Sequence, residues 1–527
     1  MRTLDPACGS GIFLRTLLEL QCNPLVPGTT PQTIAAAFEH TYAVDRDPNA
    51  SRATRLSLAL LHLVATGTLP QTLNVTTANA IDLALRNELP ARELGAAIAN
   101  PPYIKLDYLP DAERQTYIQY LDAHQRGRLD SYLAFVKLCL TIVEDAGFVC
   151  LVLPQAFLLA KNAGPLRQKI SREFDVRCLV DLSAITVFEN VGAYSILLVV
   201  QKRALEAQTG PAAHVARIFG SVGPALQAVL EGRTIDAEYY NVFDVDQAFF
   251  RRDEWTLLSA PEISLERKLE QLKPISNFLD VRQGFITGAD SVFIRPKDLI
   301  PKSDASIYID YLPDRSIAKF KLPKRADQVV FYPFDDKGPL SETQLRADFP
   351  ETWKYLLSHR RELQKRKSAA SGNPWWRPVR PRDPENILSP KIVCPHLMLT
   401  PRFAVDLRGN YAVSHSPFLV PKKGQYDPVF LKFFCAVLNS SVCHWFISTH
   451  APKYSRGYNR IEVPLLKSIP VPDPAHAHPA ALKEIVRLVD QASARDDGMA
   501  ESKLDELITA LYALTVTELV KIRGPVE

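Results

Sequence analysis

Two glycines and an acid stand together near the start of the chain, in Asp5-Pro6-Ala7-Cys8-Gly9-Ser10-Gly11. The heptapeptide follows a short apolar run and precedes a helical pattern. Glycines in such a turn let backbone amides approach a ligand closely, because no side chain intervenes. An acid at the strand end can hold a cationic or hydroxyl group. A structural turn would explain the Gly-x-Gly alone, whereas the whole heptapeptide is far more specific.

A second acid, Asp45, ends the next strand-like run, Tyr42–Val44. In doubly wound folds an acid at the tip of the second strand commonly binds a ribose diol. Asp45 follows Gly9 by 36 residues, more than the roughly 20 of the dinucleotide fingerprint. Considered alone, Asp45 is more often the cap of the following helix. Its neighbours are what favour the ligand role.

Asn100-Pro101-Pro102-Tyr103 ends a third apolar run and offers acceptors to an amine. The prolines fix the backbone and remove two amide donors. The Asn100 amide oxygen and the Pro101 carbonyl remain as acceptors for a planar NH2 group, and Tyr103 offers a ring for stacking. The motif therefore predicts a site for the exocyclic amine of a base or for an amide. A proline turn with a packed tyrosine is the structural alternative.

The elements around these motifs alternate between strands and helices, which predicts a doubly wound α/β sheet over residues 1–203. Two strands, 178–182 and 195–200, lie so close in sequence that we expect an antiparallel hairpin at the sheet edge. Residues 204–250 read as a linker or adaptor. Residues 251–475 read as a mixed α+β domain with a helix over 428–446, and residues 476–527 as C-terminal helices.

Composition fits a multidomain globular protein of 527 residues, with 46% hydrophobic and 23% charged residues. We expect no membrane span and no signal peptide. The eight cysteines are scattered, which favours reduced thiols in the cytoplasm and no metal site. The net charge of +4 says little about nucleic acid, but basic residues and tryptophans cluster over 359–382. That cluster suits a phosphate backbone or equally a solvated helix face.

Together, Asp5–Gly11 and Asn100–Tyr103 resemble motifs I and IV of S-adenosylmethionine-dependent DNA adenine-N6 methyltransferases. The motif order is similar to the gamma class, and most closely to TaqI-like and Eco57I-like restriction-modification methylases. Segments at 283–294, 391–393, 403–406, 437–441 and 469–472 resemble a TaqI-like C-terminal specificity domain. The resemblance implies a Rossmann-like methyltransferase sheet followed by a target-recognition domain that binds double-stranded DNA.

The resemblance also implies roles for individual residues. S-adenosylmethionine would contact Asp5, Ala7, Cys8, Gly9, Gly11, Asp45, Arg46, Asn79 and Asn100. Asn79 stands where the family usually has an aspartate that reads the cofactor's adenine. The target base would contact Asn100, Pro101, Pro102, Tyr103 and Phe188. DNA phosphates would contact Lys105, Arg360, Arg361, Lys365, Arg366, Lys453, Arg456 and Arg460.

The implied reaction is direct methyl transfer to a flipped-out adenine. Positioning of the reactants would be the main source of catalysis. A cytosine-C5 mechanism would need a Pro-Cys motif that we do not find, and Ser-Pro-Pro-Tyr would be more usual for cytosine N4. Within the family a segment precedes motif I, and residues 1–4 do not supply it. We expect that a partner subunit completes the pocket or carries a nuclease. A non-catalytic specificity subunit and a protein-glutamine or RNA adenine methyltransferase are the alternatives.

Overall fold

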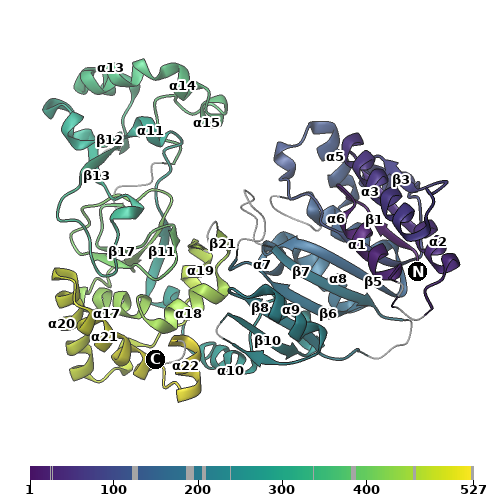
Figure 1. Cartoon of the computed structure of the whole chain (residues 1–527). Coiled ribbons are helices and arrows are strands. Elements are labelled where there is room, and N and C mark those ends of the chain that lie inside the picture. Colours follow the sequence, from purple (N-terminus) through teal and green to yellow (C-terminus); the bar gives the residue numbers. More distant parts are fainter. Residues whose placement is uncertain are drawn as a thin grey trace. The chain divides into compact units, whose positions relative to one another are not determined.

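The computed structural model describes the chain apart from residues 24, 26–27, 122–128, 186–194, 205–208, 238, 336–337, 381–386, 455–457 and 524–527. It divides into two compact units (Figure 1). Unit 1 comprises Met1–Ser259 and Lys453–Gly457. Unit 2 comprises Ala260–Pro452 and Tyr458–Glu527.

Unit 1 is built on one large mixed sheet, with strand order β3-β2-β1-β4-β5-β7-β6-β8-β10-β9. Strands β1 to β5 run parallel, and β7 is antiparallel to both β5 and β6. The doubly wound α/β expectation is confirmed. The strands are β1 (Thr3–Asp5), β2 (Thr41–Asp45), β3 (Asn74–Thr77), β4 (Leu94–Ala99), β5 (Val143–Pro154), β6 (Phe174–Asp181), β7 (Ser195–Lys202), β8 (Ala213–Ile218), β9 (Ile235–Asp236) and β10 (Tyr240–Val245).

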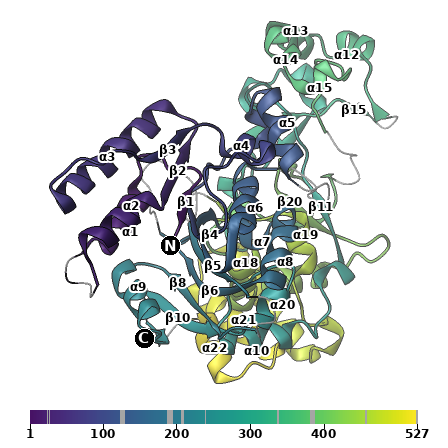
Figure 2. The same ribbon diagram turned by 90° about the vertical axis from the view of Figure 1, so that its right-hand side faces the viewer.

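Helices cover both faces of this sheet. Ala43 and Val44 are neighbours on β2 and point to opposite faces, into two separate apolar clusters. Helices α1 (Ile12–Gln21), α2 (Pro31–Glu39) and α3 (Pro48–Thr66) contribute to the Ala43 cluster, whereas α6 (Tyr132–Ile142) and α8 (Gly164–Glu173) contribute to the Val44 cluster. Figure 2 shows α1 to α3 beside β1 to β3. Burial on both faces explains why the central strand β4 has no polar side chain.

The expected linker over 204–250 is instead part of the sheet. Its segments form β8, β9 and β10, and α9 (Val222–Leu230) packs on them through Ala225 and Ala228. The hairpin of β6 and β7 is antiparallel as predicted, but it does not lie at the edge, because β8 pairs with β6 in parallel. The strands are short, and polar and glycine-containing stretches separate them, so the sequence analysis did not predict a sheet in this segment.

Unit 2 combines small antiparallel sheets with helices. One sheet has the order β11-β20-β17-β19 and another has the order β12-β14-β13. Helices α12 to α15 follow the second sheet in sequence, over Glu342–Ala370. The strands are β11 (Leu279–Gln283), β12 (Ile294–Pro296), β13 (Tyr308–Tyr311), β14 (Gln328–Phe331), β17 (Lys391–Val393), β19 (Ala404–Asp406) and β20 (Pro417–Pro421).

The predicted helix over 428–446 is two helices. Helix α17 (Pro428–Leu438) and helix α18 (Ser441–His450) are bent by 62°. The Ser440 hydroxyl caps α18 by accepting the Cys443 amide, and the buried Asn439 side chain bonds the backbone of Phe403. These side chains end one helix and start the next. The C-terminal helices are α20 (Pro479–Ala494), α21 (Gly498–Leu511) and α22 (Val516–Arg523).

Among the described residues, no single helix is long and apolar enough to cross a membrane. The bent pair α17 and α18 meets that criterion of length and composition only when the two helices are taken together.

Candidate active site

The loop between β1 and α1 has the backbone that its glycines predict. Gly9 and Gly11 have φ angles of 54° and 80°, which side chains rarely adopt. A Cβ on Gly11 would lie 2.9 Å from the Thr54 side chain, so Gly11 permits close packing on α3. A Cβ on Gly9 would meet nothing within 4 Å. Gly11 therefore packs against protein, whereas the Cα of Gly9 faces open space. The Gly9 amide and carbonyl both bond within the protein, to Asp45 and Thr54.

Asp45 is bound to this loop. Its Oδ2 accepts the Gly9 amide at 2.8 Å, and its Oδ1 accepts the Asp47 amide at 2.9 Å. Asp47 in turn caps α3 by accepting the Asn49 amide. The helix-capping role therefore belongs to Asp47 rather than Asp45. Each Asp45 oxygen keeps a lone pair for a hydroxyl donor.

Asp5 is the last residue of β1 and lies in the interior rather than on the surface of the loop. The side chain is buried and accepts the Ala7 amide at 3.0 Å. Burial, and secondarily the Asp45 charge, raise the pKa of Asp5 to about 7. Cys8 is also buried, and burial raises the pKa of its thiol to about 12, so it is a poor nucleophile.

A cavity of about 220 Å³ connects the motifs. It is lined by Pro6 and Ala7 of the first loop, by Asp45 and Arg46 after β2, by Asn79, and by Asn100 and Pro102 after β4. These residues follow the carboxyl ends of parallel strands, where ligands bind in open α/β sheets. Of the predicted cofactor residues, Ala7, Asp45, Arg46, Asn79 and Asn100 line the cavity. Asp5, Cys8, Gly9 and Gly11 are not among its lining residues.

The Asn-Pro-Pro-Tyr loop is held by hydrogen bonds on both sides. The Tyr103 hydroxyl lies 3.0 Å from both the Asn100 Oδ1 and the Val152 carbonyl oxygen. The Ser131 hydroxyl donates to the Pro102 carbonyl and accepts the Ile104 amide at 3.1 Å. Asn100 is exposed, whereas Tyr103 is half-buried with its ring edge-on to Tyr132. Tyr103 thus fixes the orientation of the Asn100 amide. Phe188 lies outside the described residues.

Helix α5 (Asp111–Tyr120) supplies cavity residues that the sequence analysis missed. Glu113 forms an ion pair with Arg46, and Tyr117 lines the cavity together with Asn79. The Asn79 oxygen accepts the Ile81 amide at 2.9 Å, which caps α4 (Ala80–Arg86). Burial, followed by the Glu113 charge, raises the pKa of Tyr117 to about 12. Leu109, Ser131 and Phe135 complete this side of the cavity. None of these three residues belongs to a motif that the sequence analysis singled out.

The predicted phosphate contacts differ in their surroundings. Arg360, Arg361, Lys365 and Lys105 are exposed, and the Arg360 guanidinium lies over the Trp375 ring. Arg460 is about half exposed and pairs with Glu462. The prediction that Arg366 contacts a phosphate needs correction. Its guanidinium donates to the carbonyls of Thr287, Trp375 and Arg377, so it stabilises the fold. Arg456 and the Lys453 side chain lie outside the described structure.

Comparison with known proteins finds a family match in each half of the chain. Residues 39–188 match the Eco57I restriction-modification methylase family, and residues 349–471 match the TaqI-like C-terminal specificity domain. The chain is 24% identical to the Type II methyltransferase M.BstVI of Geobacillus stearothermophilus, with 82% of this chain and 75% of that protein covered. It is 23% identical to the Type II methyltransferase M.XhoI of Xanthomonas vasicola, with coverages of 78% and 76%.

A solved structure shares the fold. It is the Type IIL restriction-modification enzyme MmeI in complex with DNA, with a TM-score of 0.69, 12% identity, and coverage of 99% of this chain and 72% of that one. The sheet and its cavity define a Rossmann-like methyltransferase domain. Residues 39–188 are an Eco57I-like restriction-modification methylase domain, and residues 349–471 are a TaqI-like C-terminal specificity domain.

Proposed function

We propose that this chain methylates the exocyclic N6 of adenine in double-stranded DNA, using S-adenosylmethionine, within a restriction-modification or phage-defence system in the cytoplasm. One observation carries the proposal: a single cavity joins the glycine loop, Asp45 and Asn79 to the Asn100-Pro101-Pro102-Tyr103 loop. A methyl donor held at one end would face an amine held at the other. The relatives M.BstVI and M.XhoI, named as Type II methyltransferases, support methyl transfer.

The cavity residues fit S-adenosylmethionine. Pro6 and Ala7 line one side of the cavity, and the Asp45 oxygens keep lone pairs for the ribose hydroxyls. Ala78, Asn79 and Ala80 form an edge of the cavity suited to a planar base. Bound there, the cofactor supplies a methyl group on a sulfonium. Arg46, paired with Glu113, would flank the cofactor's adenine.

The protein contributes position rather than covalent chemistry. Asn100 Oδ1, oriented by Tyr103, and the Pro101 carbonyl would accept the two N6 hydrogens of the target adenine. These contacts direct the nitrogen lone pair at the methyl carbon, so that the nitrogen–carbon bond forms as the sulfur–carbon bond breaks. The nitrogen then loses a proton to water. Holding the reactants in line makes the main contribution to the rate of methyl transfer.

The target base must leave the duplex to reach the cavity, at a cost of a few kcal/mol. Stacking on an aromatic ring contributes about 1–3 kcal/mol per base and offsets part of this cost. Tyr103 and Phe188 are the proposed stacking residues. Lys105, Arg360, Arg361, Lys365 and Arg460 are proposed to contact phosphates or bases on the flanking duplex.

The test is methyl transfer from labelled S-adenosylmethionine to unmethylated genomic DNA, followed by nucleoside analysis. We expect label in N6-methyladenine, lost in Asn100→Ala and retained in Asn162→Ala, a matched change at another asparagine of unit 1. Label in N4-methylcytosine would correct the base. Label in added protein or RNA but not in DNA would contradict the proposal. Cofactor binding without transfer would favour a specificity subunit that requires a partner.

A further inference from the structure

A cluster of basic side chains in unit 2 lies at the ends of strands and is separate from the methyltransferase cavity. His396 directly precedes β18 (Leu397–Met398), and Arg460 ends β22 (Tyr458–Arg460), which pairs with β18. His415 stands in the turn before β20. Ile461, the residue after Arg460, donates its amide to the His396 carbonyl at 2.8 Å. We call His396, His415 and Arg460 the His–Arg patch; all three lie within the matched specificity domain, residues 349–471.

His415 is held in a strained conformation. Its φ of 61° is left-handed, which is uncommon for a residue with a side chain. The turn is fixed on both sides: the His415 amide donates to the Phe285 carbonyl at 3.1 Å, and its carbonyl accepts the Gln283 side chain. The imidazole is nevertheless 49% exposed, with Nε2 3.9 Å from Asp290 Oδ2. Strain of this kind clusters at ligand-contacting sites.

His396 carries a buried atom without a partner. Its Nδ1 makes no hydrogen bond within the described part of the chain, and neither does the buried Ser414 hydroxyl beside His415. Buried polar atoms are nearly always bonded, so both point to water or a ligand group. Asp314 joins the two sides of the patch, since its carboxylate accepts the His396 amide and the Ser416 hydroxyl, each at 2.7 Å.

The patch therefore presents hydrogen-bond donors on backbone that is held in place by hydrogen bonds. The Arg460 guanidinium pairs with Glu462 at 2.9 Å but is 47% exposed, so it keeps donors directed to solvent. Each imidazole adds at least one N–H donor. Guanine presents two adjacent acceptors, N7 and O6, on one edge, whereas adenine presents an acceptor beside a donor. A donor array of this kind matches guanine.

We propose that the His–Arg patch reads the edge of a guanine in the target sequence, an inference that rests on the proposed DNA methylation. Arg460 makes the principal contact, and His415 makes the second. His396 and Asp314 position the start of β18 and the turn that carries His415. The recognition sequence consequently contains a G·C pair whose readout depends on these residues.

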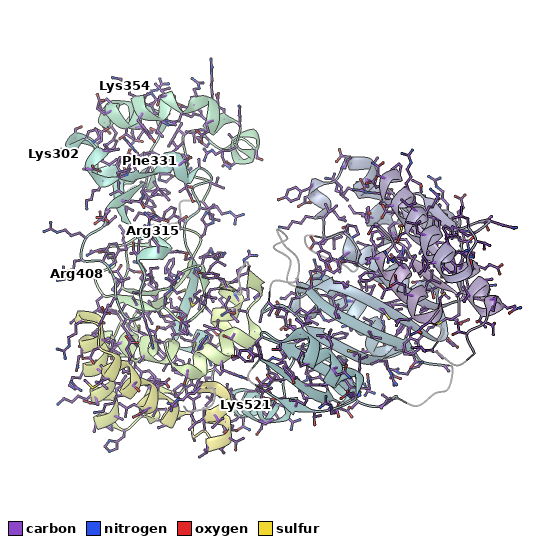
Figure 3. The ribbon with its side chains drawn as sticks, in the orientation of Figure 1. Lys302, Arg315, Phe331, Lys354, Arg408 and Lys521 are labelled. Carbon is purple, nitrogen blue, oxygen red and sulfur yellow. The ribbon has the colours of Figure 1, made fainter. Side chains whose placement is uncertain are left out.

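The first experiment compares recognition sequences in the full-length chain. Methylated sites in genomic DNA are mapped by sequencing for wild type, Arg460→Ala and His415→Gly, the last of which keeps the left-handed turn. Arg408→Ala is the control, because this exposed arginine of unit 2 is directed away from the ribbon in Figure 3. We expect discrimination at one guanine position to fall about 5- to 100-fold in both test variants. The control should read the wild-type sequence.

The second experiment removes the acceptor from the DNA instead. Binding is measured on duplexes carrying 7-deazaguanine at that position. The wild type should lose affinity with the analogue, and Arg460→Ala should bind both duplexes equally. Unchanged recognition sequences in the variants would overturn the inference. So would a uniform loss across sequences with a shallower salt dependence, which marks a phosphate contact. A wild type that methylates no defined sequence would instead overturn the proposed function, and this inference with it.

Discussion

Tyr103 combines two properties in one side chain. Its ring is the proposed stacking surface for the target base, and its hydroxyl orients the Asn100 amide. The sequence pattern predicted stacking by the ring but not the hydrogen bond of the hydroxyl. The hydroxyl is shared between Asn100 and the Val152 carbonyl, which lies 49 residues away in sequence. The two roles can be separated by mutation.

We expect Tyr103→Phe to lower the methyl-transfer rate about five- to tenfold, since one net hydrogen bond is worth about 1 kcal/mol. Tyr103→Ala should lower it about a hundredfold or more, because stacking of roughly 1–3 kcal/mol is lost as well. Single-turnover rates with saturating cofactor and DNA measure both. Equal losses in the two variants would mean that the ring contributes nothing.

Asp5 gives the stability of unit 1 a pH dependence. Its pKa rises from 3.8 to about 7 on folding, chiefly through burial. Because the folded chain then binds the proton more tightly than the unfolded chain, this contribution is fully present below about pH 4 and is lost as the pH rises to 7. The loss amounts to roughly 4 kcal/mol at most.

Asp5→Asn should therefore flatten the fall in unfolding free energy between pH 4 and 7. Urea unfolding across that range measures the slope. Asp111→Asn is the control, because the Asp111 carboxylate is 88% exposed and should leave the slope unchanged. A variant slope equal to that of the wild type would show that Asp5 ionises freely in the folded protein.

Helix α5 is the element of the site that sequence motifs did not reveal. Asp45, Asn79 and Asn100 each follow a strand, so the order of strands predicts their convergence. Glu113 and Tyr117 reach the cavity only because α5 folds back over it after the Asn-Pro-Pro-Tyr loop. No local sequence pattern predicts that α5 folds back over the cavity.

Glu113→Gln should weaken binding of S-adenosylhomocysteine, because Arg46 loses the partner that holds it beside the cavity. The pair is partly exposed, with 54% of the Arg46 side chain accessible, so the expected loss is about five-fold or less. Calorimetric titration at low and high salt measures it, and the difference should shrink as salt rises. Glu19→Gln removes an exposed pair with Arg15 and should not alter binding.

The junction of α17 and α18 shows how polar residues override an apolar helical pattern. Asn439 and Ser440 interrupt the predicted helix, and both side chains bond backbone groups that would otherwise be unpaired. Asn439→Ala would leave the buried Phe403 amide without this acceptor. We expect unit 2 to lose about 1–3 kcal/mol in unfolding free energy. Denaturant titration measures it, and a change within error would mean that the α17–α18 junction rearranges to pair the Phe403 amide.

At the scale of the whole molecule, each unit has apolar clusters of its own. The Val44 cluster runs from β1 to Trp255 in unit 1, whereas the clusters around Phe331 and Val393 lie within unit 2. Composition and length predicted more than one domain. The sequence analysis began the second domain at residue 251, close to the division at Ala260. It ended the first domain at residue 203, because β8 to β10 carry no pattern that assigns them to the preceding sheet.

Separate cores predict two unfolding transitions, since chains of several domains commonly depart from two-state behaviour. The proposed cofactor cavity lies wholly within unit 1, so S-adenosylhomocysteine at 100 times its Kd should stabilise that transition by about 2.7 kcal/mol. Asn439→Ala should lower only the other transition, which assigns each to its unit. Scanning calorimetry of the full chain, with and without ligand, measures both effects. A single transition displaced by both ligand and mutation would show that the two cores unfold as one, and that cofactor binding stabilises the specificity domain as well.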